Sequence, residues 1–414
     1  MTKTFLTLSD FELRQLTQPL QFGEYSKDLA LEIITATTLS MVSEPGDRMM
    51  GFLSRTLGSL DLMIELVEGF NVQKILWRIT ESDSLEECNR NFGDPLAALQ
   101  DSKERWLPRL KSQNLVQILT NTSAMGLSLI IPSSEIWPKG LDDLGDHAPL
   151  ALFVQGSPSV LESCLSGVSI VGSRAASSYG KVVTDLMVSQ LAEGNRAVVS
   201  GGAIGIDGFA HRAALDHSLA TIAVMAGGLD RLYPRSNFEL FTEITKSGAL
   251  ISELPLGSAP TRWRFLQRNR LIAALTPTTV VVEAGLRSGS IRTANDALEL
   301  DRELLAVPGS ILSETSAGCN ALISEGKANI FTGFLVPKFE KYSEPSELAK
   351  RAADALRDLK LANTQEIATD AGLTSGEVAQ ALAELRSRDL VNSIPLAGAN
   401  GRYALKYVER TGIS

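Results

Sequence analysis

Short apolar runs rich in valine and isoleucine alternate with longer amphipathic segments between residues 126 and 335, and this alternation restricts the fold more than any other feature. The runs are LALFVQG (150–156), GVSIVGSR (167–174), AVVSGG (197–202), ATIAVMAGG (220–228), GALISEL (248–254), TTVVVEAG (278–285) and ELLAVPGS (303–310). Continuous apolar strands separated by helices are typical of a parallel sheet that helices cover on both faces. We therefore predict an α/β fold with a parallel sheet at its core.

The region before the sheet, residues 1–125, has the pattern of a helical domain. Apolar residues recur at helical spacing in DLALEIITATTLSMV (28–42) and MMGFLSRTLGSLDLMIELVEG (49–69), and SEPGD (43–47) is predicted to be the turn between them. This region contains no chemical motif, so we expect it to pack against the sheet domain or to contact a partner.

The region after the sheet is predicted to be a linker followed by a small domain. Residues 336–347 have the proline and charge content of a boundary. Within 348–414, the segment 363–391 has the pattern of helix, turn and helix with Gly372 at the turn, and 392–405 resembles a hairpin. This order predicts a winged-helix domain. Its second helix carries Glu377 and Glu384, which suits a protein contact or a weak DNA contact better than recognition of a DNA groove.

The acidic composition means that any site for a polyanion must be local. The 414 residues carry a formal net charge of -9. No stretch approaches the roughly 18 apolar residues of a membrane helix. The three cysteines are scattered and lack the spacing of metal ligands. We expect a cytoplasmic protein without a membrane segment, a metal or a cofactor.

Nearly every predicted strand ends in glycine or serine, at the edge of the sheet where ligands of parallel α/β proteins bind. Three of these loops lead into a helix and are predicted to offer backbone donors to anions. Their residues are Gly172, Ser173 and Arg174; Gly201, Gly202, Ala203 and Gly205; and Ser288, Gly289 and Ser290. An ordinary turn is the alternative for the first loop. Neither a dinucleotide-binding glycine fingerprint nor a Walker phosphate loop occurs in the chain.

Two further segments add rings and positive charge to this edge. In GGLDRLYPRSNFELF (227–241), Tyr233 and Arg235 offer an aromatic ring and a guanidinium group. TRWRFLQRNRLIAAL (261–275) contains four arginines and no acid, and it has the pattern of a helix. Guanidinium groups interleaved with Trp263 and Phe265 suit the phosphates and stacked bases of single-stranded nucleic acid. A solvated basic face is the alternative.

The sequence offers little for catalysis, and we predict no catalytic residue. Glu253 and Glu283 end two predicted strands, where hydrogen bonding within the loops is favoured over a role as acid or base. His211 is expected to be a packed helix residue. Asp207 is predicted to cap a helix or to contact a sugar.

These motifs, in this order, resemble the DprA/Smf family of bacterial DNA-processing proteins of natural transformation. The resemblance covers about residues 130–330 and rests on GSRAASSYG, SGGAIGIDGFAH, AGGLDRLYPRSN, FLQRNRLIAAL, EAGLRSGSIRTANDAL and the blocks VPGS and GCNALISEG. It implies an extended Rossmann-like domain that binds single-stranded DNA, forms a homodimer and helps to load the RecA recombinase, with no established catalytic activity.

The resemblance also implies which residues bind single-stranded DNA. Arg174 is the first choice for a phosphate contact, and Arg235 stands where relatives often have lysine. The remaining residues carried over are Gly202, Ala203, Gly205, Asn237, Arg264, Phe265, Arg268, Asn269, Arg270 and Gly289.

Two other functions remain open from the sequence. One is a nucleotide-processing enzyme of the lysine-decarboxylase-like (LOG) type, because EAGLRSGSIRTA lies where that group has an acid beside a glycine loop. The other is a transcription regulator that binds duplex DNA through the winged helix.

Overall fold

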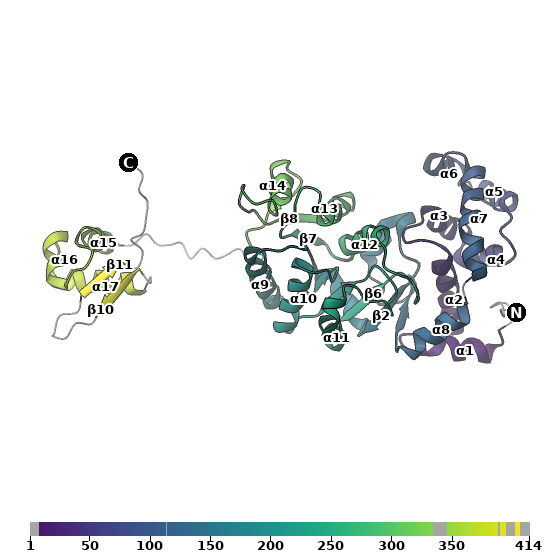
Figure 1. Cartoon of the computed structure of the whole chain (residues 1–414), viewed down its shortest axis with the longest axis horizontal. Helices are drawn as coiled ribbons and strands as arrows, with labels where there is room; N and C mark the ends of the chain where they lie inside the picture. The colour runs from purple at the N-terminus through teal and green to yellow at the C-terminus, as the bar shows by residue number, and fades with distance from the viewer. Residues whose placement is uncertain (1–7, 113, 334–345, 388–389, 395–401, 406–414) are drawn as a thin grey trace. The chain divides into compact units, whose positions relative to one another are not determined.

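The computed structural model describes residues 8–112, 114–333, 346–387, 390–394 and 402–405 (Figure 1). The chain divides into two compact units, Met1–Phe334 and Leu335–Ser414. No helix in these described ranges is long and apolar enough to cross a membrane.

The first unit begins with a set of α-helices, as the periodicity predicts. They are α1 (Asp10–Thr17), α2 (Lys27–Val42), α3 (Arg48–Leu57), α4 (Ser59–Val67), α5 (Val72–Glu81), α6 (Leu85–Phe92), α7 (Pro95–Ser112) and α8 (Leu115–Ala124). The predicted turn at 43–47 separates α2 from α3, and the Asp47 side chain caps α3 by accepting a hydrogen bond from the Met50 N–H. Asp47 also accepts from the Trp106 indole of α7 at 3.0 Å, so this turn is fixed to the helical bundle.

A nine-stranded sheet follows among the described residues, in the order β1-β2-β6-β5-β4-β3-β7-β8-β9. Its strands are β1 (Ser128–Ile130), β2 (Leu152–Gly156), β3 (Val168–Val171), β4 (Val198–Ser200), β5 (Thr221–Val224), β6 (Ala249–Ser252), β7 (Thr278–Val281), β8 (Glu303–Ala306) and β9 (Asn329–Ile330). The strands from β6 to β9 in this order run parallel. The chain lays down β4, β5 and β6 on one side of β3 and then β7, β8 and β9 on the other, so the order reverses between β3 and β7.

Helices cover both faces of the sheet, which explains why the strands are apolar at nearly every position (Figure 1). One face carries α9 (Ser178–Glu193), α10 (Ile206–Asp216) and α11 (Phe238–Ser247). The other carries α12 (Arg262–Leu275), α13 (Gly289–Glu299) and α14 (Ala317–Ser324). Strand side chains alternate between the two faces, as in β3, where Ile170 packs on the first layer and Val171 on the second.

One predicted strand joins the sheet differently from the others. The segment 150–156 forms β2, but β2 runs antiparallel to both β1 and β6. Phe153 of β2 shares a core with the N-terminal helices and with Leu250 of β6. The helices and the sheet edge therefore bury one continuous set of side chains. The parallel core is as predicted, but the expectation that the run 150–156 is one of its parallel strands is wrong.

The second unit contains α15 (Glu347–Leu359), α16 (Thr364–Ala371), α17 (Ser375–Ser387), β10 (Val391–Ile394) and β11 (Arg402–Leu405). Gly372 ends α16 in the left-handed conformation, with φ of 61°, at the predicted turn. β10 and β11 pair antiparallel, as expected for the hairpin. The predicted linker at 336–347 lies largely outside the described residues.

Candidate nucleic-acid interface

The carboxyl ends of β3 to β7 bring five loops to one edge of the sheet, called here the carboxyl edge. The loops precede α9, α10, α11, α12 and α13, and they contain the residues that the sequence singles out. The reversal of strand order between β3 and β7 makes this edge the usual ligand position in an open α/β sheet.

The Phe265 ring of α12 contacts two of these loops and Arg268 of its own helix. It meets the Tyr233 ring edge to face, with centroids 5.6 Å apart. The guanidinium carbons of Arg174 and Arg268 lie 5.6 and 5.8 Å from its centroid. Because aromatic faces attract guanidinium groups, Phe265 holds Arg174 of the first loop beside Tyr233 of the third.

Arg268 is buried beneath this ring and binds the main chain. Its Nη1 donates to the carbonyl oxygens of Gly201, at 2.7 Å, and Val224, at 2.5 Å. Burial lowers the pKa of Arg268 to about 10, so the group stays charged at neutral pH. Arg268 thus joins the ends of β4 and β5. A side chain at Gly201 would place its Cβ 2.2 Å from this Nη1, so the glycine makes room for the arginine.

The next two residues of α12 are also buried and bound to protein groups. Asn269 donates to the Gly289 carbonyl oxygen at 3.2 Å, which ties α12 to the start of α13. Arg270 pairs with Glu253 through two hydrogen bonds, of 2.7 and 2.6 Å, and both side chains are 8% exposed. The Arg270 Nε donates to the His147 carbonyl oxygen at 3.0 Å. The geometry favours structural roles for Arg268, Asn269 and Arg270 over the phosphate contacts expected from the sequence.

Arg264 faces away from the sheet, toward the N-terminal helices. It forms a two-pronged ion pair with Glu44, with both hydrogen bonds at 3.0 Å. Arg262 is exposed, and no acid among the described residues pairs with it. The four arginines of 261–275 therefore lie in four different environments, and they do not form a single basic face.

Internal carboxylates occupy two of the predicted anion positions. Glu283, which is 2% exposed, accepts from the Ser177 N–H at 2.9 Å and from the Ser177 hydroxyl at 2.6 Å, at the start of α9. Asp207 is buried under the second loop, where burial raises its pKa while Arg268 and nearby N–H groups oppose this shift. The switch point between β3 and β7 is thus closed by protein groups. Glu283 has the hydrogen-bonding role that the sequence favours. Asp207 does not cap α10, whose N-cap is Gly205 without a side-chain hydrogen bond, and it accepts from the Ala203 N–H instead.

The glycine-rich loops pack against one another. A Cβ at Gly172 would lie 2.6 Å from Ile206, and one at Gly205 would lie 2.2 Å from the Ser173 carbonyl oxygen. Gly205 also has φ of 87°, which only glycine adopts without strain. Asn237 donates to the carbonyl oxygens of Gly202, at 3.0 Å, and Ala203, at 3.2 Å. These residues shape the carboxyl edge from within.

Arg174 and Arg235 remain open to solvent. Both side chains belong to exposed residues, and no acid among the described residues forms an ion pair with either. At the start of α13, Ser288 and Ser290 hydrogen bond to each other through their hydroxyls, and Gly289 has open space beside its Cα. Arg174, Arg235, Ser288 and Gly289 are therefore predicted site residues that an external anion can reach. Ser290 is buried, with 8% of its surface exposed.

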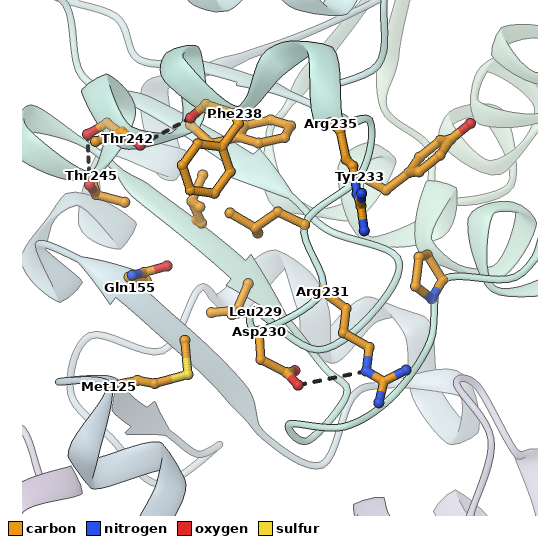
Figure 2. Close-up of a pocket in the computed structure, with 14 residues that line it drawn as sticks. Met125, Gln155, Leu229, Asp230, Arg231, Tyr233, Arg235, Phe238, Thr242 and Thr245 are labelled. Carbon is orange, nitrogen blue, oxygen red and sulfur yellow. Dashed lines mark hydrogen bonds and ion pairs between the residues drawn. The ribbon is translucent and has the colours of Figure 1, made fainter.

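A pocket of about 880 Å³ lies beside Tyr233 and Arg235, between α11 and β2 (Figure 2). Its lining includes Arg231 and Phe238, which the sequence did not single out as site residues. Phe238 is 59% exposed and Tyr233 48%. Its position three residues after Arg235 was the signal that could have identified Phe238. The sequence pattern did not single it out, because an apolar side chain at the start of a helix is ordinarily assigned to the core. Two exposed rings and two guanidinium groups thus border one open pocket. Arg231 forms an ion pair at 3.7 Å with Asp230, which also lines the pocket (Figure 2).

Two other kinds of reactive side chain in the described sheet and helical regions, His211 and the cysteines, are buried. Burial lowers the pKa of His211 to about 3, and His211 hydrogen bonds to Thr221, as expected for a packed residue. The three cysteines are free and buried. In the part of the chain that the structure describes, no group of three or more His, Cys, Asp or Glu side chains could hold a metal ion.

Fold and edge together define a doubly wound α/β protein whose carboxyl edge presents guanidinium and aromatic groups to solvent. The family model described as DNA recombination-mediator protein A matches residues 128–335. The chain belongs to this family.

Relatives in three bacteria agree with this assignment. The putative DNA processing protein DprA of Mycobacterium tuberculosis is 39% identical over 285 residues, which cover 63% of this chain and 73% of that protein. DNA processing protein DprA of Bacillus subtilis is 35% identical over 236 residues, covering 57% of this chain and 77% of that protein. The X-ray structure of DprA from Streptococcus pneumoniae superimposes with a TM-score of 0.56 and 29% identity, covering 73% of this chain and 95% of that chain.

Proposed function

We propose that this protein binds single-stranded DNA without sequence preference along the carboxyl edge. The observation that carries the proposal is the open pocket bordered by Tyr233, Phe238, Arg231 and Arg235, with Arg174 held beside it by Phe265. Exposed rings suit stacking on any base, and guanidinium groups suit any phosphate, so this combination holds a strand without recognising its sequence.

The proposal divides the predicted site residues, apart from Arg264, into two groups. Arg174 and Arg235 contact phosphates and Tyr233 stacks on a base. Ser288 and Gly289 extend the anion-binding edge toward α13, with the buried Ser290 hydrogen bonded to Ser288. The residues that shape the edge are Gly172, Ser173, Gly201, Gly202, Ala203, Gly205, Asn237, Phe265, Arg268, Asn269 and Arg270. A locally basic edge on an acidic body holds a flexible strand while the rest of the surface repels nonspecific duplex.

Membership of the DNA recombination-mediator protein A family supports a role in recombination beyond DNA binding. We propose that the protein acts as a recombination mediator in the cytoplasm during natural transformation, that it works as a homodimer, and that it helps to load RecA onto incoming strands. No catalytic step is included, because Glu283, the acid that a nucleotide-processing enzyme would use, is buried and hydrogen bonded.

We further propose that the second unit is a winged helix that contacts protein. Two acids of α17 accept hydrogen bonds from other groups of the second unit. Glu377 accepts from the Thr374 N–H and hydroxyl, and Glu384 accepts from the Ser346 hydroxyl. A helix with these carboxylates is a poor match for DNA phosphates.

The test is fluorescence anisotropy of labelled oligo-dT against the matched duplex at several salt concentrations. Three guanidinium contacts, from Arg174, Arg231 and Arg235, predict a slope of log K against log salt of about -2 for a single strand. Between about 50 and 200 mM salt, the affinity should then fall about 20-fold. Equal affinity for duplex, or a flat salt response, would refute the proposal.

A further inference from the structure

The carboxylate of Glu44 is held by two arginines from different parts of the first unit. Arg264 of α12 donates through Nε to Oε2 and through Nη2 to Oε1, both at 3.0 Å. Arg109 of α7 donates to Oε1 at 2.5 Å. A guanidinium fork of this geometry binds a phosphate as readily as a carboxylate, since both present two oxygens to parallel N–H donors.

This cluster lies where a ligand from solvent can reach it. The side chains of Arg264, Arg109 and Glu44 are 17%, 38% and 31% exposed. Glu44 also borders an open groove of about 850 Å³, which Trp263 and Gln267 of α12 line on one side. The ion pair is therefore only partly desolvated, and exchange of its anion does not require the core to open.

The cluster lies next to the residues that are proposed to bind the DNA strand at the carboxyl edge. Phe265, the neighbour of Arg264, holds Arg174 and Tyr233 at the carboxyl edge. Arg264 itself donates through Nη1 to the Ala259 carbonyl oxygen at 2.8 Å. The next residue, Pro260, lines the pocket beside Tyr233 and Arg235, called here the strand pocket because it is proposed to hold the DNA strand. On the other side of Arg264 stands Trp263, which is 57% exposed. Arg264 thus lies between the pocket and the groove, with an exposed ring adjacent to it.

We propose that Arg264 and Arg109 form a second phosphate subsite for the DNA strand, and that the carboxylate of Glu44 fills this subsite when no strand is bound. The inference rests on the proposed function. A backbone phosphate and a carboxylate each carry one negative charge, so the exchange keeps the arginines paired while Glu44 returns to water.

Glu44 is ionised under ordinary conditions and therefore competes with the strand. Burial raises the pKa of Glu44, but hydrogen bonds and charge from Arg264 and Arg109 outweigh this, so its pKa lies below the usual value. Removing the charge should leave the two arginines available to a phosphate without a competitor.

The test is the Glu44→Gln variant of the full chain, measured with oligo-dT by anisotropy over a salt series. The amide keeps the size of the side chain and loses its charge. We expect affinity at low salt to rise several-fold, because the DNA strand no longer has to displace a carboxylate. The salt slope should stay the same, because the unaltered protein already makes this phosphate contact when the strand is bound. The double variant Glu44→Gln/Arg264→Gln should lose the gain in affinity.

Glu87→Gln is the matched control. Glu87 also pairs with an arginine, Arg55 of α3, at 2.6 Å, and its loss changes the net charge equally. Glu87 lines neither the strand pocket nor the groove beside α12. This variant should leave the affinity for oligo-dT unchanged. In addition, Arg264→Gln with Glu44 intact should make the slope shallower by about 0.7, which tests the subsite even if Glu44→Gln does not fold.

The outcomes separate this inference from the proposed function. If the unaltered protein fails to bind oligo-dT, the proposed function is refuted and the subsite with it. If the protein binds but Glu44→Gln behaves like Glu87→Gln, or weakens binding, Glu44 is a structural ion-pair partner and only the subsite is refuted.

Discussion

The ion pair between Arg270 and Glu253 offers the sharpest test of the structural roles assigned to α12. Both side chains are 8% exposed, and two hydrogen bonds of 2.7 and 2.6 Å join them. In Arg270→Met the Glu253 carboxylate stays buried without its partner, and the His147 carbonyl oxygen also loses a donor. Breaking a buried pair from one side costs about 3–5 kcal/mol of the free energy of unfolding.

Urea unfolding followed by tryptophan fluorescence measures this loss. The four tryptophans, at positions 77, 106, 137 and 263, all belong to the first unit, so the signal reports on the unit that contains the pair. With an m-value of about 3 kcal/mol/M, a loss of about 3–5 kcal/mol lowers the urea midpoint by about 1–1.7 M. The double variant Arg270→Met/Glu253→Gln should recover most of this, because the uncompensated charge is removed as well.

A different result would refute the structural role of Arg270. If Arg270→Met keeps the urea midpoint of the unaltered protein but loses affinity for oligo-dT, Arg270 contacts the strand, as expected from the sequence alone. If the double variant is no more stable than Arg270→Met, the loss does not arise from a buried, unpaired Glu253.

The other predictions concern the carboxyl edge. Arg174→Ala should weaken oligo-dT binding and make the salt slope shallower by about 0.7 while the urea midpoint stays the same; an unchanged slope would contradict the phosphate contact. Phe238→Ala should cost about 1–3 kcal/mol of strand binding, the range for one stacked base, whereas Phe11→Ala, at an exposed ring on α1, should cost nothing in the same anisotropy assay. Gly201→Ala forces a Cβ against Arg268 and should destabilise the first unit by about 1–3 kcal/mol in urea; an unchanged midpoint would show that Arg268 can move aside.

The secondary structure of the sheet region could be predicted because its cause is local. A strand buried on both faces needs an apolar side chain at nearly every position, as in Val168–Val171, where Ser169 is the exception and donates its hydroxyl to the Ile272 carbonyl oxygen. This requirement is visible in a few consecutive residues. Since parallel strands end at one edge, the position of the candidate site also followed from the pattern. The antiparallel direction of β2 could not be predicted in this way, because it depends on contacts with β6 and the N-terminal helices.

The sequence by itself indicated β2 to β8, the edge at which the glycine loops gather and the presence of rings and arginines there. It did not indicate the two strands at the ends of the sheet order, β1 and β9. Only the tertiary structure decided what each arginine does. Arg264 meets Glu44 across 220 residues of chain, and Arg268 meets Gly201 across 67. The physical reason is that a long charged side chain takes its role from the groups that the fold places around its end, and local spacing does not specify those groups. Arg174 and Arg235 are the best candidates for contacting the phosphates of the DNA strand, because the fold leaves these two residues exposed to solvent.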